Sequence, residues 1–271
     1  MRFHLPKAIQ GALLVAGSLV LSMLLAEAAA REFLPQPYRP AQTSMHQNGF
    51  DVVLGRLHRP DAKIGWVLSP DPKQFHHRRS DDKGVVAFDV VYSLAAGKRQ
   101  IPAVPLSGPL LIATGCSFTF GHGLNDADTW PAQLQQKLPN YRVVSVAAIG
   151  YGTDQALLAA ERELQQHKGQ IGGVVLGFAD FHIQRNRSAQ SWLVTAYPFS
   201  KPLFALRSGK VEYQGQVRYW EGGLAVKYSD LFAHILNVSA NRVYRIPSYE
   251  NARELTVGLI CDFARRWRPR V

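Results

Sequence analysis

Cysteine is scarce in this 271-residue sequence, which contains only Cys116 and Cys261. No C-x-x-C spacing occurs, so the cysteines do not indicate a metal or redox site. We expect each of them to behave as a lone, small apolar residue. A disulfide between the two would require an oxidising compartment, and the sequence alone does not place them within bonding distance.

Acidic residues are fewer than basic ones. The chain has 20 Asp and Glu against 31 Lys and Arg, a formal net charge of +11. The basic residues are scattered, whereas nucleic-acid binding favours a concentrated basic stripe interleaved with aromatic residues. We therefore expect no nucleic-acid partner. Two interpretations of the excess charge stay open: it serves solubility, or it favours anionic envelope polymers and lipid head groups.

Internal repeats and low-complexity tracts are absent, and apolar residues make up 46% of the chain, which is ordinary for a globular core. A chain of this length can hold one α/β domain and a smaller region. The pattern along the chain predicts three parts: a signal peptide or membrane anchor over residues 1–31, a linker and small β-rich region over 32–105, and an α/β domain over 106–271.

The amino terminus has the form of an export signal. Arg2 and Lys7 precede an uncharged apolar run over residues 8–26, and small residues follow it. The run is long for a cleaved signal peptide and barely long enough to span a bilayer, so both a cleaved signal and an uncleaved anchor stay open. In either case the basic flank predicts that the rest of the chain is exported, into the periplasm or the extracellular space.

Residues 50–103 are predicted to form short strands. Three runs, 52–55, 64–68 and 85–92, are rich in β-branched and aromatic residues, with Pro and Gly between them. The His pair within residues 76–79 does not suggest a metal site, because adjacent side chains on a strand point to opposite faces. A solvated turn is the interpretation that we favour for these four residues.

Strand-like and helix-like patterns alternate after residue 106. Strands are predicted over 110–113, 141–148 and 173–178, and helices over 132–138, 153–168, 228–243 and 249–267. The region between residues 187 and 227 is less regular and favours loops with a hairpin. Alternation of strand and helix predicts a three-layer α/β fold with a parallel sheet and right-handed connections.

Ser117 follows the first of these strands at a tight turn. The segment Gly115-Cys-Ser-Phe-Thr-Phe-Gly121 resembles the first block of the SGNH/GDSL hydrolases, usually written G-D-S-F-T-x-G, and the likeness continues to Pro131. The resemblance implies a flavodoxin-like sheet, an activity on acyl esters and Ser117 as the nucleophile. Cys116 stands where the family usually has Asp. From the residues alone, a serine that merely caps the turn is an equally good interpretation.

Two later segments resemble the second and third blocks of this family. Residues 145–152 imply that the N–H of Gly150 donates to an oxyanion, and Gly150 also suits a turn that needs positive φ. Residues 176–186 imply that Asp180 lines the site. Ala179 occupies the position of an Asn that normally donates another hydrogen bond, and losing such a donor typically lowers the rate by about 100- to 1,000-fold.

The fourth block of the family, a late D-x-x-H that supplies the base, does not occur after Ser117. The chain is therefore expected to be truncated relative to the family and to lack its last strands. Among the remaining candidates, His182 is the best placed base, because a 2-1-3 strand order would bring its loop beside Ser117. The other histidines after the nucleophile are His122, His167 and His234.

Two functions stay open at this point. One is hydrolysis or transfer of an acyl ester by Ser117, without a metal or organic cofactor, on an acylated small molecule, a lipid or an envelope glycan. The other is a non-catalytic envelope-binding protein or an inactive remnant of such a hydrolase. The second is favoured by the departures at Cys116 and Ala179 and by the missing base. Membrane attachment through residues 8–26 is compatible with both.

Overall fold

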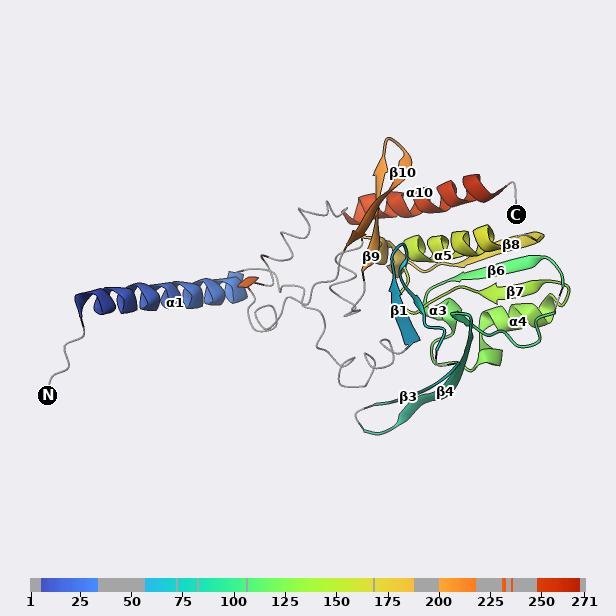
Figure 1. Ribbon diagram of the computed structural model, residues 1–271, viewed down its shortest axis with the longest axis horizontal. Coiled ribbons are helices and arrows are strands. Elements are labelled where there is room, and N and C mark those ends of the chain that lie inside the picture. The colour runs from blue at the N-terminus through green and yellow to red at the C-terminus, as the bar shows by residue number, and fades with distance from the viewer. Residues whose placement is uncertain are drawn as a thin grey trace. The chain divides into compact units, whose positions relative to one another are not determined.

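A computed structural model of the protein (Figure 1) describes residues 6–33, 57–71, 73–81, 83–105, 107–167, 169–187, 200–217, 231–232, 235 and 248–268. The chain forms two compact units. The smaller unit comprises Met1–Arg39 and Glu221–Val243, and the larger comprises Pro40–Trp220 and Tyr244–Val271. The predicted strand over 52–55 and most of the predicted helix over 228–243 lie outside the described residues.

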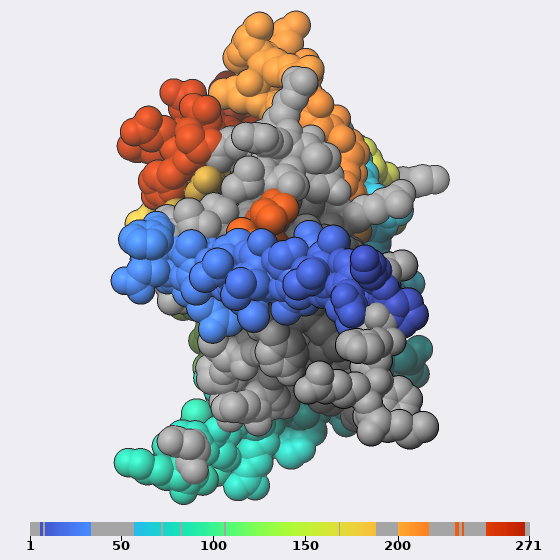
Figure 2. All heavy atoms as spheres, turned by 90° about the vertical axis from the view of Figure 1, so that its left-hand side faces the viewer, coloured from blue at the N-terminus to red at the C-terminus, as the bar shows by residue number. Residues whose placement is uncertain are grey.

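The smaller unit contains helix α1 (Lys7–Phe33). Its segment Ile9–Phe33 is long and apolar enough to cross a membrane. The helix is drawn in blue in Figure 2, and its large apolar side chains between Ile9 and Leu25 are exposed, with Leu14 and Met23 75% and 69% exposed. A helix that is apolar all round requires apolar surroundings. Helix α1 therefore fits the predicted signal peptide or membrane anchor.

The larger unit is built on a mixed six-stranded sheet in the order β3-β4-β5-β7-β6-β8 (Figure 1). The strands are β3 (Gln74–Ser80), β4 (Val86–Ala95), β5 (Lys98–Arg99), β6 (Leu110–Gly115), β7 (Arg142–Ser145) and β8 (Ile171–Gly177). Strand β6 pairs in parallel with β7 on one side and β8 on the other. The predicted α/β class is confirmed, and the three parallel strands have the 2-1-3 order.

Strand β6 is buried at all of its positions, as expected for a parallel strand covered on both faces. Leu110 and Ile112 share a core cluster with residues of helix α5 (Thr153–Gln166) and helix α10 (Tyr249–Trp267). Leu111 and Ala113 face the other side and pack near helix α4 (Trp130–Lys137). Successive side chains on β6 thus enter two different cores, which gives the layered arrangement.

Helix α4 starts two residues before the predicted helix over 132–138. The side chain of Thr129 accepts a hydrogen bond from the N–H of Ala132, and Pro131 lies in the first turn. Helix α10 begins after Ser248, whose hydroxyl accepts from the N–H of Asn251 at 3.2 Å. The bounds of α10 match the predicted helix over 249–267 at both ends.

The strands between residues 58 and 99 do not form a single sheet. Strands β1 (His58–Asp61) and β2 (Gly65–Leu68) pair only with each other, whereas β3, β4 and β5 extend the central sheet through the antiparallel pair Arg99 and Ser145. The region is β-rich, as predicted. The domain boundaries drawn from the sequence, at residues 31 and 105, stay predictions.

The prediction of a solvated turn over residues 76–79 is wrong. These residues lie within β3 and pair with β4. His77 is buried and His76 is exposed, in keeping with the alternation of a strand. Side-chain contacts with β4 hold these residues in a strand. The ring of His77 packs edge-on against Phe88 at 4.7 Å between centroids, and its Nδ1 lies 3.0 Å from the hydroxyl of Tyr92.

The irregular region after residue 187 contains the predicted hairpin, formed by β9 (Lys201–Arg207) and β10 (Lys210–Val217). This hairpin and the β3–β4 hairpin lie at opposite ends of the larger unit, in orange and teal in Figures 1 and 2. Helix α10 contacts β10 and β9, so the hairpin joins the side of the sheet that α5 and α10 cover.

Candidate functional site

Ser117 lies one residue beyond the end of β6, as the first residue of the short helix α3 (Ser117–Phe120). Gly115 ends the strand with φ +154°, and a Cβ at this position would lie 2.2 Å from the side-chain oxygen of Thr119. Only glycine allows so close a turn. The half-buried Ser117 is thereby placed at the carboxyl edge of the parallel strands, where open α/β sheets hold their reacting groups.

Thr119 fills the space between the ends of β6 and β8. A Cβ on Gly177 would also lie 2.2 Å from the Thr119 hydroxyl oxygen. Thr119 is 1% exposed, and its hydroxyl has no hydrogen-bond partner among the described residues. No sequence motif identifies Thr119 as part of the site. The one sequence feature that relates to its position is indirect: β6 and β8 both end in a glycine, which leaves room for the Thr119 side chain.

The chain that follows α3 is held by Arg99, a buried residue of β5. Its guanidinium donates hydrogen bonds to the carbonyl oxygens of Phe120 (2.7 Å), Gly121 (2.7 Å) and Leu124 (2.5 Å) and to the carboxylate of Asp126 (2.9 Å). The N–H groups of Gly121 and His122 in turn donate to the Ser117 carbonyl, both at 2.9 Å. One side chain thus positions the segment around the nucleophile candidate. The sequence around Arg99 has no motif that predicts these contacts.

Gly150 lies in the turn between β7 and α5, with φ +85° as expected of a turn glycine. The turn is fastened to β2. Trp66 Nε1 donates to the Ile149 carbonyl at 3.1 Å, and the Tyr151 hydroxyl donates to the Trp66 carbonyl at 2.7 Å. These two buried hydrogen bonds fix the backbone on both sides of Gly150. Its role as an oxyanion donor stays a prediction.

Asp180 lies at the start of helix α6 (Phe181–Asn186), in the loop after β8. The residue is exposed, and its side chain does not cap the helix. Asp180 therefore faces solvent near the carboxyl end of β8. The structure places it in the expected loop, and its contribution to a site stays a prediction.

His182 is fully buried, with 0% of its surface exposed. Its ring lies edge-on to Phe181 at 4.9 Å and to Phe178 at 5.6 Å, and neither ring nitrogen has a hydrogen-bond partner among the described residues. Burial, together with the positive charges of Arg185 and Lys201, lowers the pKa of His182 to about 4. The imidazole is therefore neutral near pH 7, and no hydrogen bond joins it to Ser117.

The remaining histidines lie elsewhere. His122 contacts the β3–β4 hairpin, with ring centroids 5.2 Å from His77 and 5.3 Å from Phe88. Burial and the charges of two arginines lower the pKa of His122 to about 4. His167 is the C-cap of α5, and His234 lies outside the described residues. The backbone N–H of His122 donates to the Ser117 carbonyl, but its ring packs on the hairpin.

A buried ion pair lies at the start of α5, four residues after Gly150. Lys201 of β9 donates to the Asp154 carboxylate at 2.5 Å, and each side chain is 1% exposed. Asn186 of α6 accepts from the Asp154 N–H at 3.3 Å and donates to the Thr256 hydroxyl at 2.7 Å. Burial lowers the pKa of Lys201, and the carboxylate opposes that shift. The network connects the turn to β9, α6 and α10, and no local sequence pattern predicts it.

Two further features bear on ligands. Within the described ranges, no group of three or more His, Cys, Asp or Glu side chains is arranged to hold a metal ion. Cys116 is buried, Cys261 is exposed, and both are free thiols.

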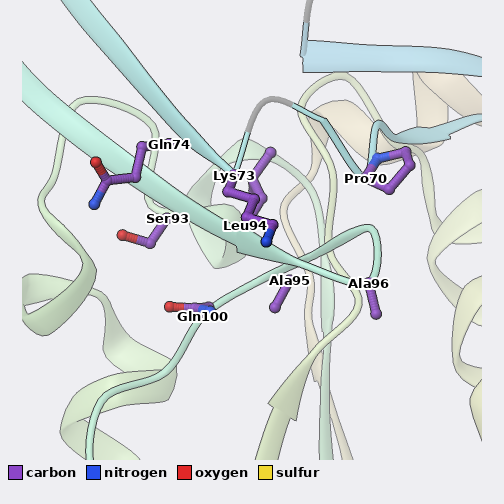
Figure 3. A pocket seen from close by; sticks show the side chains of 8 residues that line it. All are labelled: Pro70, Lys73, Gln74, Ser93, Leu94, Ala95, Ala96 and Gln100. Atoms are coloured by element: carbon purple, nitrogen blue, oxygen red, sulfur yellow. The ribbon is translucent and has the colours of Figure 1, made fainter.

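A hollow of about 650 Å³ opens at the base of the β3–β4 hairpin (Figure 3). Its lining residues are Pro70, Lys73, Gln74, Ser93, Leu94, Ala95, Ala96 and Gln100. None of the site residues predicted from the sequence lines it, so we do not assign the reaction to this hollow.

Comparison with known proteins gives a weak structural likeness. No protein-family model matches the chain, and no curated protein matches it. Among solved structures, the chain is similar to AlinE4, an esterase of the SGNH-hydrolase family, at 15% identity, and to two mutants of that esterase at 14%. Each match covers 60% of this chain and 74% of the other, with a TM-score of 0.29. A likeness at this level carries no argument about the site.

Proposed function

We propose that the protein is an ester hydrolase or acyltransferase of SGNH/GDSL type with Ser117 as its nucleophile. One observation carries the proposal: Ser117 follows the central parallel strand β6 directly, in the segment whose sequence resembles the nucleophile block of that family. A serine hydroxyl at this edge is accessible to an ester carbonyl, and acyl transfer requires such a group together with a base and oxyanion donors.

In the proposed reaction, the Ser117 oxygen bonds to the carbonyl carbon of an ester and the alcohol leaves with a proton. Water or an acceptor hydroxyl then takes the acyl group from Ser117. The N–H groups of Ser117 and Gly150 hold the negative charge on the carbonyl oxygen. The parallel pairing of β6 with β7, with Ala113 opposite Ser145, supports this assignment because it brings the turns after the two strands to the same edge.

His182 is the proposed base, and Asp180 lines the site. The support is topological. Strand β8 pairs with β6 up to Gly177 opposite Gly115, and the ring of Phe118 in α3 contacts Phe181 in α6 at 5.5 Å. Because the imidazole makes no hydrogen bond to Ser117, the proposal requires the two groups to approach when substrate binds. Catalytic hydrogen bonds often tighten only in such a complex.

A second candidate function is binding without turnover, as in a non-catalytic envelope protein. The observation that favours it is the state of His182, which is enclosed by aromatic rings and whose ring nitrogens make no hydrogen bond to a described residue. Such a protein would retain the site for an acylated ligand and would leave the ester intact.

A covalent serine probe separates the two functions. An alkyl fluorophosphonate is expected to label Ser117 of the full chain, as identified by mass spectrometry, and Ser117→Ala should abolish labelling. Ser107→Ala is the matched control, since Ser107 is an exposed serine outside the strands. A folded protein that the probe leaves unmodified would support binding without turnover. Unchanged ester hydrolysis by Ser117→Ala would overturn the catalytic assignment.

The same proposal places the protein outside the cytoplasm, attached to the membrane or exported by α1. The supporting observation is the exposed apolar surface of α1 together with the basic residues Arg2 and Lys7, which precede the apolar run over residues 8–26. An acylated small molecule, a lipid or an acylated envelope glycan would meet the site in that compartment.

A further inference from the structure

Four aromatic rings form a continuous row that begins at the residue after Ser117. Phe118 contacts Phe181, with centroids 5.5 Å apart and planes at 86°; Phe181 contacts His182 at 4.9 Å; and His182 contacts Phe178 at 5.6 Å. We call Phe118, Phe178, Phe181 and His182 the aromatic row. It connects α3 with α6 and with the loop after β8.

Both ends of the aromatic row are exposed. Phe118 and Phe178 are 68% and 46% exposed, whereas Phe120, two residues after Phe118, is fully buried in the core. Helix α3 thus buries one phenylalanine and presents the other to solvent. Large apolar side chains that gather on the surface of a folded protein commonly mark a binding site.

The surroundings of the aromatic row suit an uncharged occupant. Among the described residues, the cationic group that stacks on the row is Arg185, whose guanidinium lies 4.4 Å from the Phe181 ring centroid and donates to the Tyr151 carbonyl at 2.9 Å. Because the Arg185 guanidinium is held between the Phe181 ring and the Tyr151 carbonyl, its charge is not directed at the exposed faces of Phe118 and Phe178.

We infer that the aromatic row binds the apolar acyl chain of the ester that Ser117 attacks. This inference rests on the proposed function and adds the substrate class: esters of acyl groups longer than acetyl. In the covalent intermediate the acyl carbon is bonded to the Ser117 oxygen, so the chain that extends from it starts one residue from Phe118, and we expect it to reach that exposed ring. An acetyl group has no chain to make that contact.

The inference predicts how the rate depends on chain length. Each methylene that leaves water on the aromatic row should raise kcat/KM by about three- to fourfold. The full chain, in detergent, would be tested with p-nitrophenyl acetate, butyrate and hexanoate. The ratio of kcat/KM for hexanoate to that for acetate is expected to exceed about 10.

Substitutions at Phe118 test the contact. Phe118→Ser should lower the hexanoate-to-acetate ratio by about tenfold, and Phe118→Leu should retain most of it because the side chain stays apolar. The control is Tyr213→Ser, since Tyr213 is 43% exposed on β10 and its ring contacts Phe204 rather than the aromatic row. All variants meet the same detergent, so partition of the esters into micelles cancels in the comparison.

The outcomes are distinguishable. Suppose that Ser117→Ala abolishes hydrolysis. If the wild type then hydrolyses hexanoate and acetate with equal kcat/KM, or if Phe118→Ser has the same hexanoate-to-acetate ratio as the wild type, the inference is overturned and the proposed function stands. If Ser117→Ala hydrolyses the esters as the wild type does, the proposed function fails and the inference falls with it. A Phe118→Ser protein with an unchanged ratio and a smaller oligomeric state would assign the row to contact between copies of the chain, which also overturns the inference.

Discussion

At the scale of single residues, Arg99 has the largest structural effect that the sequence did not reveal. Its planar guanidinium meets three carbonyl oxygens and one carboxylate while lying 4.5 Å from the Tyr92 ring centroid and 4.8 Å from that of Phe120. A lysine ammonium is compact and cannot reach all of these acceptors from one position. The segment after Ser117 therefore depends on the shape of this side chain as well as on its charge.

Replacing Arg99 by Lys is expected to lower the free energy of unfolding by about 3 kcal/mol, because buried carbonyl oxygens lose their donors. Urea denaturation followed by tryptophan fluorescence measures this. Arg78→Lys serves as the control, since the Arg78 side chain is 59% exposed, and a surface change of this kind stays within about 0.5 kcal/mol. Equal stabilities of the two variants would show that Arg99 does not hold the segment.

At the scale of elements, the β3–β4 hairpin contacts the segment that follows α3. The Tyr92 hydroxyl accepts from the Gly123 N–H at 2.9 Å, and the rings of His77 and His122 lie 5.2 Å apart. Burial lowers the pKa of both histidines to about 4, with His122, Arg79 and His76 adding to the effect on His77, and Arg79 and Arg99 adding to that on His122. The contact is therefore made between neutral imidazoles.

This arrangement predicts loss of stability in mild acid. The pKa of a histidine in the unfolded chain is about 6.5, and the folded values are about 4, so between these limits the unfolded state binds protons that the folded state does not. Above about pH 6.5 both histidines are neutral in the folded and the unfolded state, so they do not change the free energy of unfolding. As the pH drops from 6.5 towards 4, each histidine lowers the free energy of unfolding by about 1.4 kcal/mol per pH unit. Urea midpoints measured from pH 7 to 4 check this.

A variant separates the two histidines from other acid effects. His122→Phe keeps an aromatic ring at the contact but removes one proton-binding group, so the slope of stability against pH should decrease between pH 6.5 and 4. His76→Phe is the matched control because His76 is exposed, its imidazole pairs with Asp89 on the surface of the hairpin, and its charge is the smallest of the contributions that lower the pKa of His77. An unchanged slope in His122→Phe would contradict the assignment.

At the scale of the whole molecule, the chain combines an α/β unit with one apolar helix. Inside the larger unit, β7, β6 and β8 place the turns bearing Gly150, Ser117 and Asp180 at one edge. Helix α1 belongs to the smaller unit, and its exposed leucines match the interior of a bilayer rather than water.

The proposed attachment to the membrane through α1 predicts that the full chain pellets with membranes and resists extraction by alkaline carbonate. Leu19→Lys places a charge near the middle of α1, where insertion becomes less favourable by about 3 kcal/mol, and should shift protein to the soluble fraction. Phe33→Lys, at the end of the helix, is the control and should behave as wild type. A carbonate-soluble wild-type protein that lacks the first residues by mass would identify α1 as a cleaved signal.

The sequence by itself determined the elements whose signals are local. Helix α10 was predicted with its exact bounds because Leu255, Leu259 and Phe263 recur at helical spacing, and all three are buried. The unbroken apolar run of β6 likewise indicated a strand buried on both faces, and placed Ser117 just beyond its end. Periodicity and glycine placement are properties of neighbouring residues, so one sequence suffices to read them.

Only the tertiary structure decided which side chains meet. Arg99 and Phe120 are 21 positions apart, Asp154 and Lys201 are 47 apart, and Asn186 and Thr256 are 70 apart, yet each pair is joined by a buried hydrogen bond. The enclosure of His182 by the rings of Phe178 and Phe181 is likewise a feature of the folded chain alone. No local pattern encodes such pairs, because their strength depends on a distance and a loss of water that exist only once the chain has folded.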